Sequence, residues 1–486
     1  MTHNNHKTMN TIFKHALGVA FTFAALLAFS ACMGGGHAMQ SGGEVTGVRA
    51  ASFTEPAPYG MVEVKRGYLK TGLQDNDSLW GVYAPQKDIS VDGFWMDQTE
   101  VTNSMYRQFV EWVRDSIIRE RLAESGDETF KITEDRYGEP VTPHLNWSKP
   151  IPWRKPTEDE EQAIKSVYVK HPIDGSVMLD TKQLIYRYEV FDYEKAALRK
   201  YRLNPAERNL NTSDDPVMIS KDTAYVDENG EIIRQTIERP LSSLYDFLNT
   251  YIVRVYPDTT CWVNDFPNAN NEAYMKLYFT SPTYNDYPVV GVTWEQAEAF
   301  CAWRTTYLLR GMGPQARYIQ RYRLPTEIEW EYAARGKEGN PFPWQGQESK
   351  NGNGCYFANF KPDRGNYTED GNLITSKVGI YGANSNGLYD MAGNVAEWTS
   401  TVFTESGVDA MADLNPQLKY NAAKEDPYVL KRKSVRGGSW KDPLSMIRSA
   451  WRAWEYQNQP RSYIGFRCVR SKAVTTSSNS DTKRRR

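Results

Sequence analysis

The chain of 486 residues is long enough for two or three average domains or one large one, and 40% apolar with 24% charged residues is typical of a globular protein with a sizeable core. Its formal net charge of −2 gives no electrostatic argument for nucleic acid or for an acidic substrate. The 30 tyrosines and 14 tryptophans predict a loop-rich fold held together by large aromatic side chains.

The first segment is typical of a bacterial lipoprotein signal. Two lysines precede an apolar run over 16–29, and small residues then lead to Cys32. The run is shorter than the roughly 20 residues that a membrane-spanning helix needs. We expect residues 1–31 to be removed and Cys32 to carry the lipid anchor, with a buried apolar helix as the alternative. The glycine-rich residues 32–58 are then a flexible tether.

The location and the redox setting follow from this signal. No acidic residue follows Cys32 directly, so nothing in the sequence argues for retention in the inner membrane. Four further cysteines would then lie in an oxidising compartment, where disulfides persist. They allow three pairings, between which the sequence does not choose. They are Cys261, Cys301, Cys355 and Cys468. No CxxC pair or Cys/His cluster indicates zinc.

Ordered sequence begins near Tyr59. Alternation predicts a strand at 61–64, a hairpin return at 67–72 and a further strand at 91–95. Thr102 can cap the helix that follows. The apolar face of that helix has helical spacing and comprises Tyr106, Phe109, Val110 and Val113.

Between about 115 and 285 the pattern loosens. Charged helical pieces such as 193–201 occur, and a hairpin is expected to turn at 227–230. Basic side chains gather in the first of these pieces, where they form either a partner contact or a solvated helix face. They are Lys195, Arg199, Lys200, Arg202 and Arg208.

Clear secondary-structure patterns return after residue 285. Residues 288–292 predict a short buried strand. Capping boxes at 293–296 and 326–329 predict two helix starts, and the second helix is expected to end near Gly336. The polar tail, 473–486, is expected to be disordered.

The stretch 386–399 combines two glycine-containing turns with an alternating run, and two carboxylates, Asp390 and Glu397, bracket its backbone. Such a loop can turn several carbonyl oxygens toward one point, and Ca²⁺ takes about six to eight oxygen ligands. The alternative is a tight turn leading into a buried strand, with Glu397 paired locally, because the spacing is not that of an EF-hand.

Histidine usage restricts catalysis. Only three histidines follow the signal, at His37, His144 and His171, and none lies in the ordered core. A Ser-His-Asp triad or a His-rich metal site is therefore not expected. No GxSxG, P-loop or GxGxxG before a helix is present. Hydrolysis by a carboxylate pair stays open, although nothing selects a pair. The residues favour a binding or structural protein.

Seven collinear segments together resemble the formylglycine-generating enzyme, or sulfatase-modifying factor, domain. They are 60–62, 97–103, 288–294, 323–336, 387–398, 436–440 and 465–468. The order matches over about 59–472, with a long insertion at about 115–285. The resemblance implies an α+β, C-type-lectin-like fold that is low in regular secondary structure.

The resemblance also implies two calcium ions and one disulfide. For one ion the matching positions are the side chains of Asn359 and Asp370 with the carbonyls of Phe360 and Asn372. For the other they are the side chains of Asp390 and Glu397 with the carbonyls of Gly393 and Val395. The implied disulfide joins Cys301 to Cys468 and leaves Cys261 and Cys355 free or paired.

The sequence departs from the family where its oxidases carry a copper-holding pair of cysteines. After the Arg-Gly-Gly-Ser segment, 441–447 contains no cysteine, and none lies between Cys355 and Cys468. Without thiolates there is no soft copper site and no redox nucleophile. The iron-dependent branch takes its metal from histidines of an added domain, and this chain has no such cluster. We therefore expect neither copper nor catalysis.

The lipoprotein signal, the degenerate domain and the insertion together resemble the GldK (PorK) family of gliding-motility lipoproteins, and the paralogous GldJ family shares most of these features. The resemblance implies a homo-oligomeric ring with a GldN/PorN-type partner in the type IX secretion machinery, anchored by lipid to the periplasmic face of the outer membrane. Two alternatives are a calcium-dependent, lectin-like surface binding protein and an oxidase that uses another residue set.

Overall fold

The computed structural model describes residues 55–72, 86–135, 137–172, 175–208, 216–337, 339–362, 365–409 and 411–472, which all belong to one unit, Glu55–Arg486. The expected signal, Cys32, most of the tether and the tail lie outside the described residues. Among the residues that are described, no helix is both long enough and apolar enough to cross a membrane.

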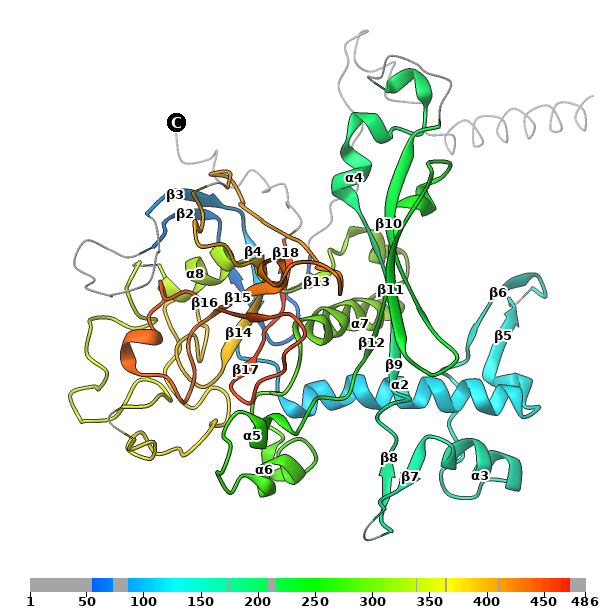
Figure 1. The fold of residues 1–486 in the computed structure, drawn as a ribbon, viewed down its shortest axis with the longest axis horizontal. Helices are drawn as coiled ribbons and strands as arrows, with labels where there is room; N and C mark the ends of the chain where they lie inside the picture. Colours follow the sequence, from blue (N-terminus) through cyan, green and yellow to red (C-terminus); the bar gives the residue numbers. More distant parts are fainter. Residues whose placement is uncertain are drawn as a thin grey trace, which may run out of the picture. The chain divides into compact units, whose positions relative to one another are not determined.

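Two long helices, α2 (Asn103–Glu124) and α7 (Trp294–Met312), contribute to the main hydrophobic cluster (Figure 1). The rings of Tyr106 and Phe300 stack between them, with centroids 5.5 Å apart. The buried Tyr106 hydroxyl donates a hydrogen bond to the carbonyl of Val255 at 2.9 Å. The core is therefore built by aromatic contacts, as the composition predicts.

The helix-start signals in the sequence are confirmed. The Thr102 side chain accepts a hydrogen bond from a backbone N–H in the first turn of α2, and Thr293 begins α7 with a complete capping box. Thr326 does the same for α8 (Glu327–Arg335), which ends at Gly336, a residue with a φ of 68°. Each cap satisfies backbone donors that a helix start leaves without partners.

Two four-stranded sheets form the body of the fold (Figure 1). In pairing order the first consists of β1 (Met61–Val64), β4 (Phe94–Asp97), β18 (Val469–Ser471) and β13 (Tyr322–Arg323), all antiparallel. The second consists of β16 (Ala453–Tyr456), β15 (Arg432–Arg436), β14 (Ala396–Val402) and β17 (Ile464–Gly465), with β14 and β17 parallel. Strands from the two ends of the domain are therefore direct neighbours.

The remaining strands form antiparallel pairs. They are β2 (Gly67–Lys70) with β3 (Asp88–Val91), β5 (Lys131–Glu134) with β6 (Pro140–Leu145), β7 (Tyr168–Lys170) with β8 (Val177–Leu179), β9 (Ile185–Phe191) with β12 (Leu248–Arg254), and β10 (Met218–Val226) with β11 (Ile232–Pro240). The short α-helices are α3 (Glu158–Lys165), α4 (Tyr193–Ala197), α5 (Cys261–Asn264) and α6 (Glu272–Leu277). Short 3-10 helices are η1 (Glu128–Phe130), η2 (Arg199–Tyr201), η3 (Pro205–Glu207), η4 (Leu244–Phe247), η5 (Pro282–Tyr284), η6 (Gly313–Tyr318), η7 (Tyr428–Lys431) and η8 (Leu444–Met446).

Two strand predictions are wrong. The segment 91–95 is not one strand, because β3 ends before Asp92 and β4 begins after Gly93, whose N–H donates to the Asp92 carboxylate at 2.8 Å. The segment 288–292 is buried but forms no ladder. Its backbone N–H groups donate to two different segments, from Val289 to Val101 and from Gly291 to Arg461, so no single strand can pair with it.

Parts of the region 115–285 enter the core. Leu184 and Val255 have no exposed surface and belong to the hydrophobic cluster that α2 and α7 build. The Tyr186 ring on β9 packs edge-on against Phe109 at 5.2 Å. The predicted turn at 227–230 is confirmed and joins β10 to β11, which form a long two-stranded ribbon (Figure 1). The region is therefore partly core and partly projecting ribbon.

Leu184→Ala tests whether region 115–285 shares the hydrophobic core of the domain. We expect the substitution to lower the free energy of unfolding of the whole unit by about 2–5 kcal/mol, because it opens a cavity in the shared core. Chemical denaturation followed by tryptophan fluorescence measures the change. Leu203→Ala, at a side chain that is 39% exposed, is the control and should cost less than about 1 kcal/mol. An unchanged main transition in Leu184→Ala would mean that region 115–285 folds independently.

Candidate functional site

The stretch 386–399 folds as a glycine-containing turn that leads into β14. Asp390, Gly393 and Asn394 have positive φ angles of 55°, 74° and 56°. A side chain at position 393 would overlap the carbonyl oxygen of Asn359, so the backbone requires glycine there. This turn places the side chains of Asp390 and Glu397 in a buried polar cluster.

Glu397 forms an ion pair with Arg467, and neither side chain has any exposed surface. The Nε of Arg467 lies 2.9 and 2.8 Å from Oε1 and Oε2 of Glu397, and its Nη2 lies 2.7 Å from Oε1. The indole N–H of Trp330 donates to Oε2 at 2.8 Å. Glu397 is paired, as the alternative interpretation expects, but its partners lie 67 and 70 residues away in the sequence. The pair therefore joins the segments 387–398, 323–336 and 465–468.

Glu100 and Asp390 form the other half of the cluster. Glu100 Oε1 accepts a hydrogen bond from the side-chain amide of Asn394 at 3.0 Å, and Asp390 Oδ2 accepts one from the N–H of Gly379 at 2.6 Å. The second oxygen of each carboxylate, Oε2 of Glu100 and Oδ1 of Asp390, is buried and accepts no hydrogen bond from a protein donor. The two carboxyl groups contact each other.

The cluster holds more negative than positive charge. Glu100, Asp390 and Glu397 contribute three carboxylates, and Arg467 contributes one guanidinium. Burial and the neighbouring charge of Asp390 raise the pKa of Glu100 well above its usual range. Burial also raises the pKa of Asp390. Burial is the main cause of both shifts, neighbouring carboxylates add to them, and the Arg467 guanidinium acts against them.

The first predicted ligand set is also brought together. Asp370 accepts hydrogen bonds from the N–H groups of Phe360 at 2.8 Å and Asn372 at 3.0 Å, so its carboxylate closes the loop between them. The buried Asn359 adjoins this loop, and its carbonyl accepts a hydrogen bond from the N–H of Asn394 at 2.7 Å. The two predicted ligand sets are therefore adjacent, and the hydrogen bond between Asn359 and Asn394 joins them.

The two carboxylates of the second set fit calcium to different degrees. Asp390 has a bare, buried oxygen suited to a hard cation, whereas both oxygens of Glu397 already accept hydrogen bonds. Over the part of the chain that the structure describes, no three His, Cys, Asp or Glu side chains form a group that could hold a metal ion. Calcium at either position would therefore depend on backbone carbonyls, such as those of Gly393 and Val395.

Cys301 on α7 and Cys468 before β18 are in contact in the core. Their sulfurs are 3.4 Å apart, against about 2.05 Å in a disulfide, so the structure shows two touching thiols. The predicted pair is thus placed together without a bond. Cys261 is buried and Cys355 is exposed, and both are free thiols.

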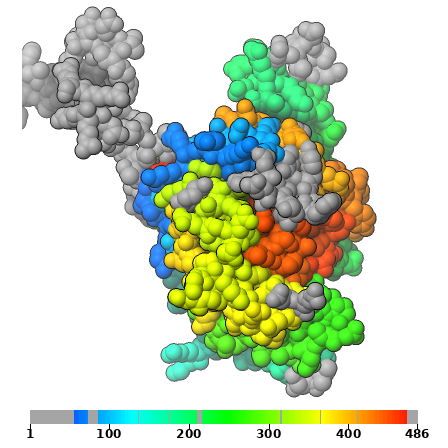
Figure 2. All heavy atoms as spheres, turned by 90° about the vertical axis from the view of Figure 1, so that its left-hand side faces the viewer, coloured from blue at the N-terminus to red at the C-terminus, as the bar shows by residue number. Residues whose placement is uncertain are grey.

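The segment 441–447 forms an ordered turn without a thiol. Asp442 accepts hydrogen bonds from the N–H of Ser439 at 2.9 Å and from its hydroxyl at 2.7 Å, and Ile447 is fully buried against the 342–360 region. The carbonyl of Asp442 accepts the N–H of Lys361 at 2.9 Å. Figure 2 shows the adjoining face, where the loops near 340–375 (yellow) lie beside the segment near 445 (red-orange). At the positions where the family resemblance places redox thiols, this segment therefore has side chains that hold a turn and fill the core, such as Asp442 and Ile447.

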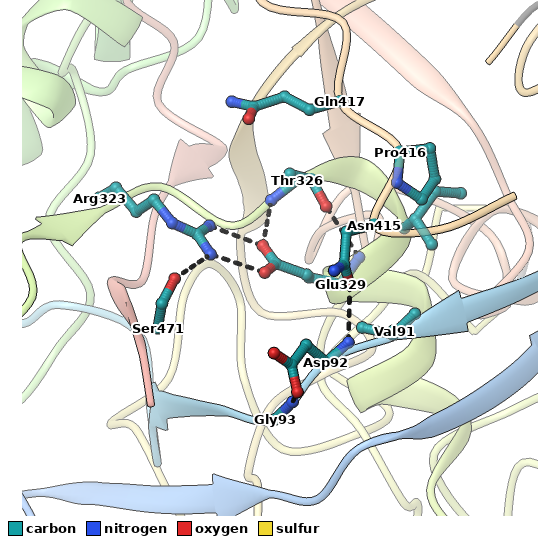
Figure 3. Close-up of a pocket in the computed structure, with 11 residues that line it drawn as sticks. Val91, Asp92, Gly93, Arg323, Thr326, Glu329, Asn415, Pro416, Gln417 and Ser471 are labelled. Atoms are coloured by element: carbon teal, nitrogen blue, oxygen red, sulfur yellow. Dashed lines mark hydrogen bonds and ion pairs between the residues drawn. The ribbon is translucent and has the colours of Figure 1, made fainter. Parts of the chain in front are cut away.

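A small cavity of about 240 Å³ lies at the start of α8 (Figure 3). Its most charged wall is the ion pair between Arg323 and Glu329, with N–O distances of 2.6 and 2.7 Å. Ser471 accepts a further hydrogen bond from Arg323, and the Asn415 side chain closes the opposite wall. Because these polar groups are paired with one another, the cavity presents no reactive group.

A second buried network joins α8 to β15. Glu327 accepts hydrogen bonds from Arg452 at 2.6 Å and from Arg436 at 3.1 Å, and all three side chains are buried. Burial acts to raise the pKa of Glu327, but the charges of Arg452 and Arg436 outweigh it and hold that pKa below its usual value. The segment 436–440 is therefore tied to the segment 323–336 by charge.

Lys433 on β15 is a fully buried amine that the sequence did not single out. Its ammonium group lies 4.2 Å from the centroid of the Trp294 ring and donates a hydrogen bond to the carbonyl of Tyr420. Burial lowers the pKa of Lys433 from about 10.5 to about 7. Lys433 does not line the cavity at the start of α8.

Comparisons with known proteins agree with the resemblance. A family model described as "Sulfatase-modifying factor enzyme 1-like domain" matches residues 49–178 and 216–472. The inactive C-alpha-formylglycine-generating enzyme 2 of Bos taurus is 33% identical over 191 residues, which are 38% of this chain and 50% of that protein. The formylglycine-generating enzyme of Mycobacterium tuberculosis is 35% identical over 190 residues, 38% of this chain and 57% of that protein.

The chain spans about half the length of the curated relatives it matches. Among solved structures, PvdO from Pseudomonas aeruginosa aligns with a TM-score of 0.41 and 16% identity, over 87% of this chain and 100% of that one. The relatives thus include both a protein named as inactive and a protein named as an enzyme.

Gly393→Ala should disrupt the turn. We expect a loss of more than about 2 kcal/mol of unfolding free energy, because the left-handed backbone costs alanine roughly 1–2 kcal/mol and the added methyl group overlaps Asn359. Thermal and chemical denaturation measure the loss. Gly354→Ala is the matched control, because its φ of 81° is similar and nothing lies within 4 Å of the added carbon. Equal losses in the two variants would contradict the close contact.

Lys433 should give the stability a pH dependence. Between pH 7 and 10 the unfolded chain carries a proton that the folded chain lacks, so the unfolding free energy should rise with pH by up to about 1.4 kcal/mol per unit. Lys433→Met keeps the packing volume and should lack this rise. Urea titrations of both proteins at several pH values measure the difference between them. Parallel curves would show that the amine titrates normally in the folded state.

Proposed function

The chain belongs to the family of proteins with a sulfatase-modifying factor enzyme 1-like domain, and we propose that it is a non-catalytic, structural member with the C-type-lectin-like body of that family. The observation that carries this proposal is the segment 441–447. Where the resemblance places a copper-holding thiol pair, Asp442 caps a turn and Ile447 fills a hydrophobic cluster. Soft copper ligands and a redox nucleophile are both missing from this segment.

We further propose that the protein is anchored to the outer membrane through lipid on Cys32, on the periplasmic side. There it serves as a ring-forming subunit of the type IX secretion and gliding machinery, together with a GldN/PorN-type partner. The support is the order of sequence features: a lipoprotein signal, a degenerate domain and a long mid-domain region. Membership of the GldJ group is the alternative on the same features.

The surface around α4 is the proposed contact face. Residues 179–215 fall outside the family match, so this part is an addition to the shared domain. Exposed apolar side chains gather here and at the adjoining ends of β10 and η4. They are Tyr193, Leu198, Leu203, Met218, Leu244 and Tyr245. A cluster of such side chains on a soluble surface is typical of a protein contact. The neighbouring basic side chains, among them Arg199 and Lys200, would form its rim.

The ribbon that carries this face is fixed to the body. Arg234 on β11 donates hydrogen bonds to the carbonyls of Asn421 at 2.7 Å and Ala422 at 3.1 Å, and it forms an ion pair with Asp222 at 3.1 Å. A surface held in this way loses little conformational freedom on binding, which favours a structural role over a mobile arm.

Calcium and the disulfide belong to the same proposal. We propose structural calcium at the two predicted positions, because each combines a carboxylate with loop carbonyls: the half-buried Asp370 at one and the buried Asp390 at the other. We also propose that Cys301 and Cys468 are oxidised to a disulfide in the mature protein, since their sulfurs already touch. A calcium-dependent lectin is the second candidate function, and its support is the proposed fold alone.

The assembly can be tested by gentle detergent extraction from the native membrane. A tagged chain should run in a large complex, and Leu198→Glu combined with Tyr245→Glu should reduce it to smaller species, because charge is introduced into an apolar contact. Tyr68→Glu, at a side chain that is 75% exposed on the body, is the control. A wild-type chain that runs only as a free monomer would count against the structural role.

Anchoring and catalysis have separate tests. Cys32→Ser should release the protein from the membrane fraction and abolish its labelling with radioactive palmitate. Copper titration and an assay of cysteine oxidation in a substrate peptide should both be negative, with a formylglycine-generating enzyme as the positive control. Turnover by the purified chain would overturn the non-catalytic assignment.

A further inference from the structure

We infer that Glu100, rather than Glu397, is the second carboxylate ligand of the calcium ion at the Asp390 turn. The inference rests on the calcium site proposed above and changes its composition. It moves one ligand from β14 to the segment between β4 and α2, which is some 290 residues away in the chain.

Glu397 has no capacity left for a metal ion. Arg467 donates to both of its oxygens and Trp330 donates to Oε2, so each oxygen already accepts two hydrogen bonds. A cation bound there would also lie next to the Arg467 guanidinium, which is buried with Glu397. The positive charge of the guanidinium would repel the cation. Removing Glu397 from this pair to bind calcium would leave Arg467 buried without its counter-charge, at a cost of several kcal/mol.

Glu100 and Asp390, by contrast, each have one oxygen without a partner. Oε2 of Glu100 and Oδ1 of Asp390 are both buried, and the two carboxyl groups contact each other. Glu100 is fully buried and Asp390 is 7% exposed, so water cannot solvate these oxygens freely. Two buried carboxylate oxygens in one cluster, neither with a protein hydrogen-bond donor, are a suitable pair of ligands for a hard divalent cation.

A hydrogen bond links Glu100 to the turn that carries the predicted carbonyls. Asn394 lies between Gly393 and Val395, and its side chain donates to Oε1 of Glu100 at 3.0 Å. This hydrogen bond orients the carboxylate so that its other oxygen remains free, in the manner of an outer-shell partner of a metal ligand. Asn394 itself is held by the turn, since its N–H donates to the carbonyl of Asn359.

The charge of the cluster agrees with one bound dication. Arg467 neutralises Glu397, and two negative charges remain on Glu100 and Asp390. Arg467 also acts on Glu100, but its guanidinium is paired with Glu397. A calcium ion would balance the two remaining charges in a site that is shielded from solvent.

The test measures calcium bound per full-length chain by equilibrium dialysis with radioactive calcium, together with the rise in melting temperature that calcium chloride gives over EDTA. Glu100→Gln keeps the hydrogen bond from Asn394 and removes the charge. It should lose one bound ion relative to the wild type and lose most of the thermal shift. Glu397→Gln should melt at a lower temperature in EDTA but keep the number of bound ions. Glu405→Gln, on a side chain that is 82% exposed, should behave as the wild type.

Other results overturn the inference. If Glu100→Gln binds as many ions as the wild type and Glu397→Gln loses one, Glu397 is the ligand. If the wild type binds no calcium, the proposed calcium site fails as well, so the two failures are distinguishable. Should Glu100→Gln not fold, Glu100→Asp keeps the charge on a shorter side chain, and its calcium affinity should fall roughly tenfold or more. Unchanged affinity in Glu100→Asp also overturns the inference.

Discussion

The buried ion pair between Arg467 and Glu397 is the interaction on which the rest of the domain depends. It joins β14 to the segment before β18, and Trp330 attaches α8 to the same carboxylate. Arg467 also donates to the carbonyls of Asp97 at 3.1 Å and Tyr389 at 2.9 Å, so four separate segments meet at one guanidinium. Removal of either charged partner would leave the other buried and uncompensated, which costs roughly 3–5 kcal/mol.

A second network, around Glu327, repeats this arrangement between α8 and β15. These two networks connect five of the seven segments that carry the family resemblance, namely 97–103, 323–336, 387–398, 436–440 and 465–468. This explains how the body keeps its organisation although 441–447 carries no redox thiols. The residues that hold the scaffold together, such as Arg436, are distinct from the residues that oxidase chemistry would need.

Local signals made much of the fold predictable. The capping boxes at 293–296 and 326–329 and the turn at 227–230 depend on a few adjacent residues, and the structure has them where the sequence predicts them. The segment 288–292 was mispredicted because its apolar pattern reflects burial, and its hydrogen-bond partners come from two distant segments. Only part of the site was predictable, again because contacts between distant segments leave no local signal in the sequence. Asp390 is visible from its turn, but the bond between Glu397 and Arg467 and the position of Glu100 depend on contacts across the chain.

The neighbouring positions of β4 and β18 set the order of events when the chain is made. The pairing of Met96 with Val469 closes the first sheet with almost the last residues that the structure describes. The first sheet is therefore complete only after β18 has been synthesised. The thiols of Cys301 and Cys468 can come into contact only at the same stage, because Cys468 directly precedes β18.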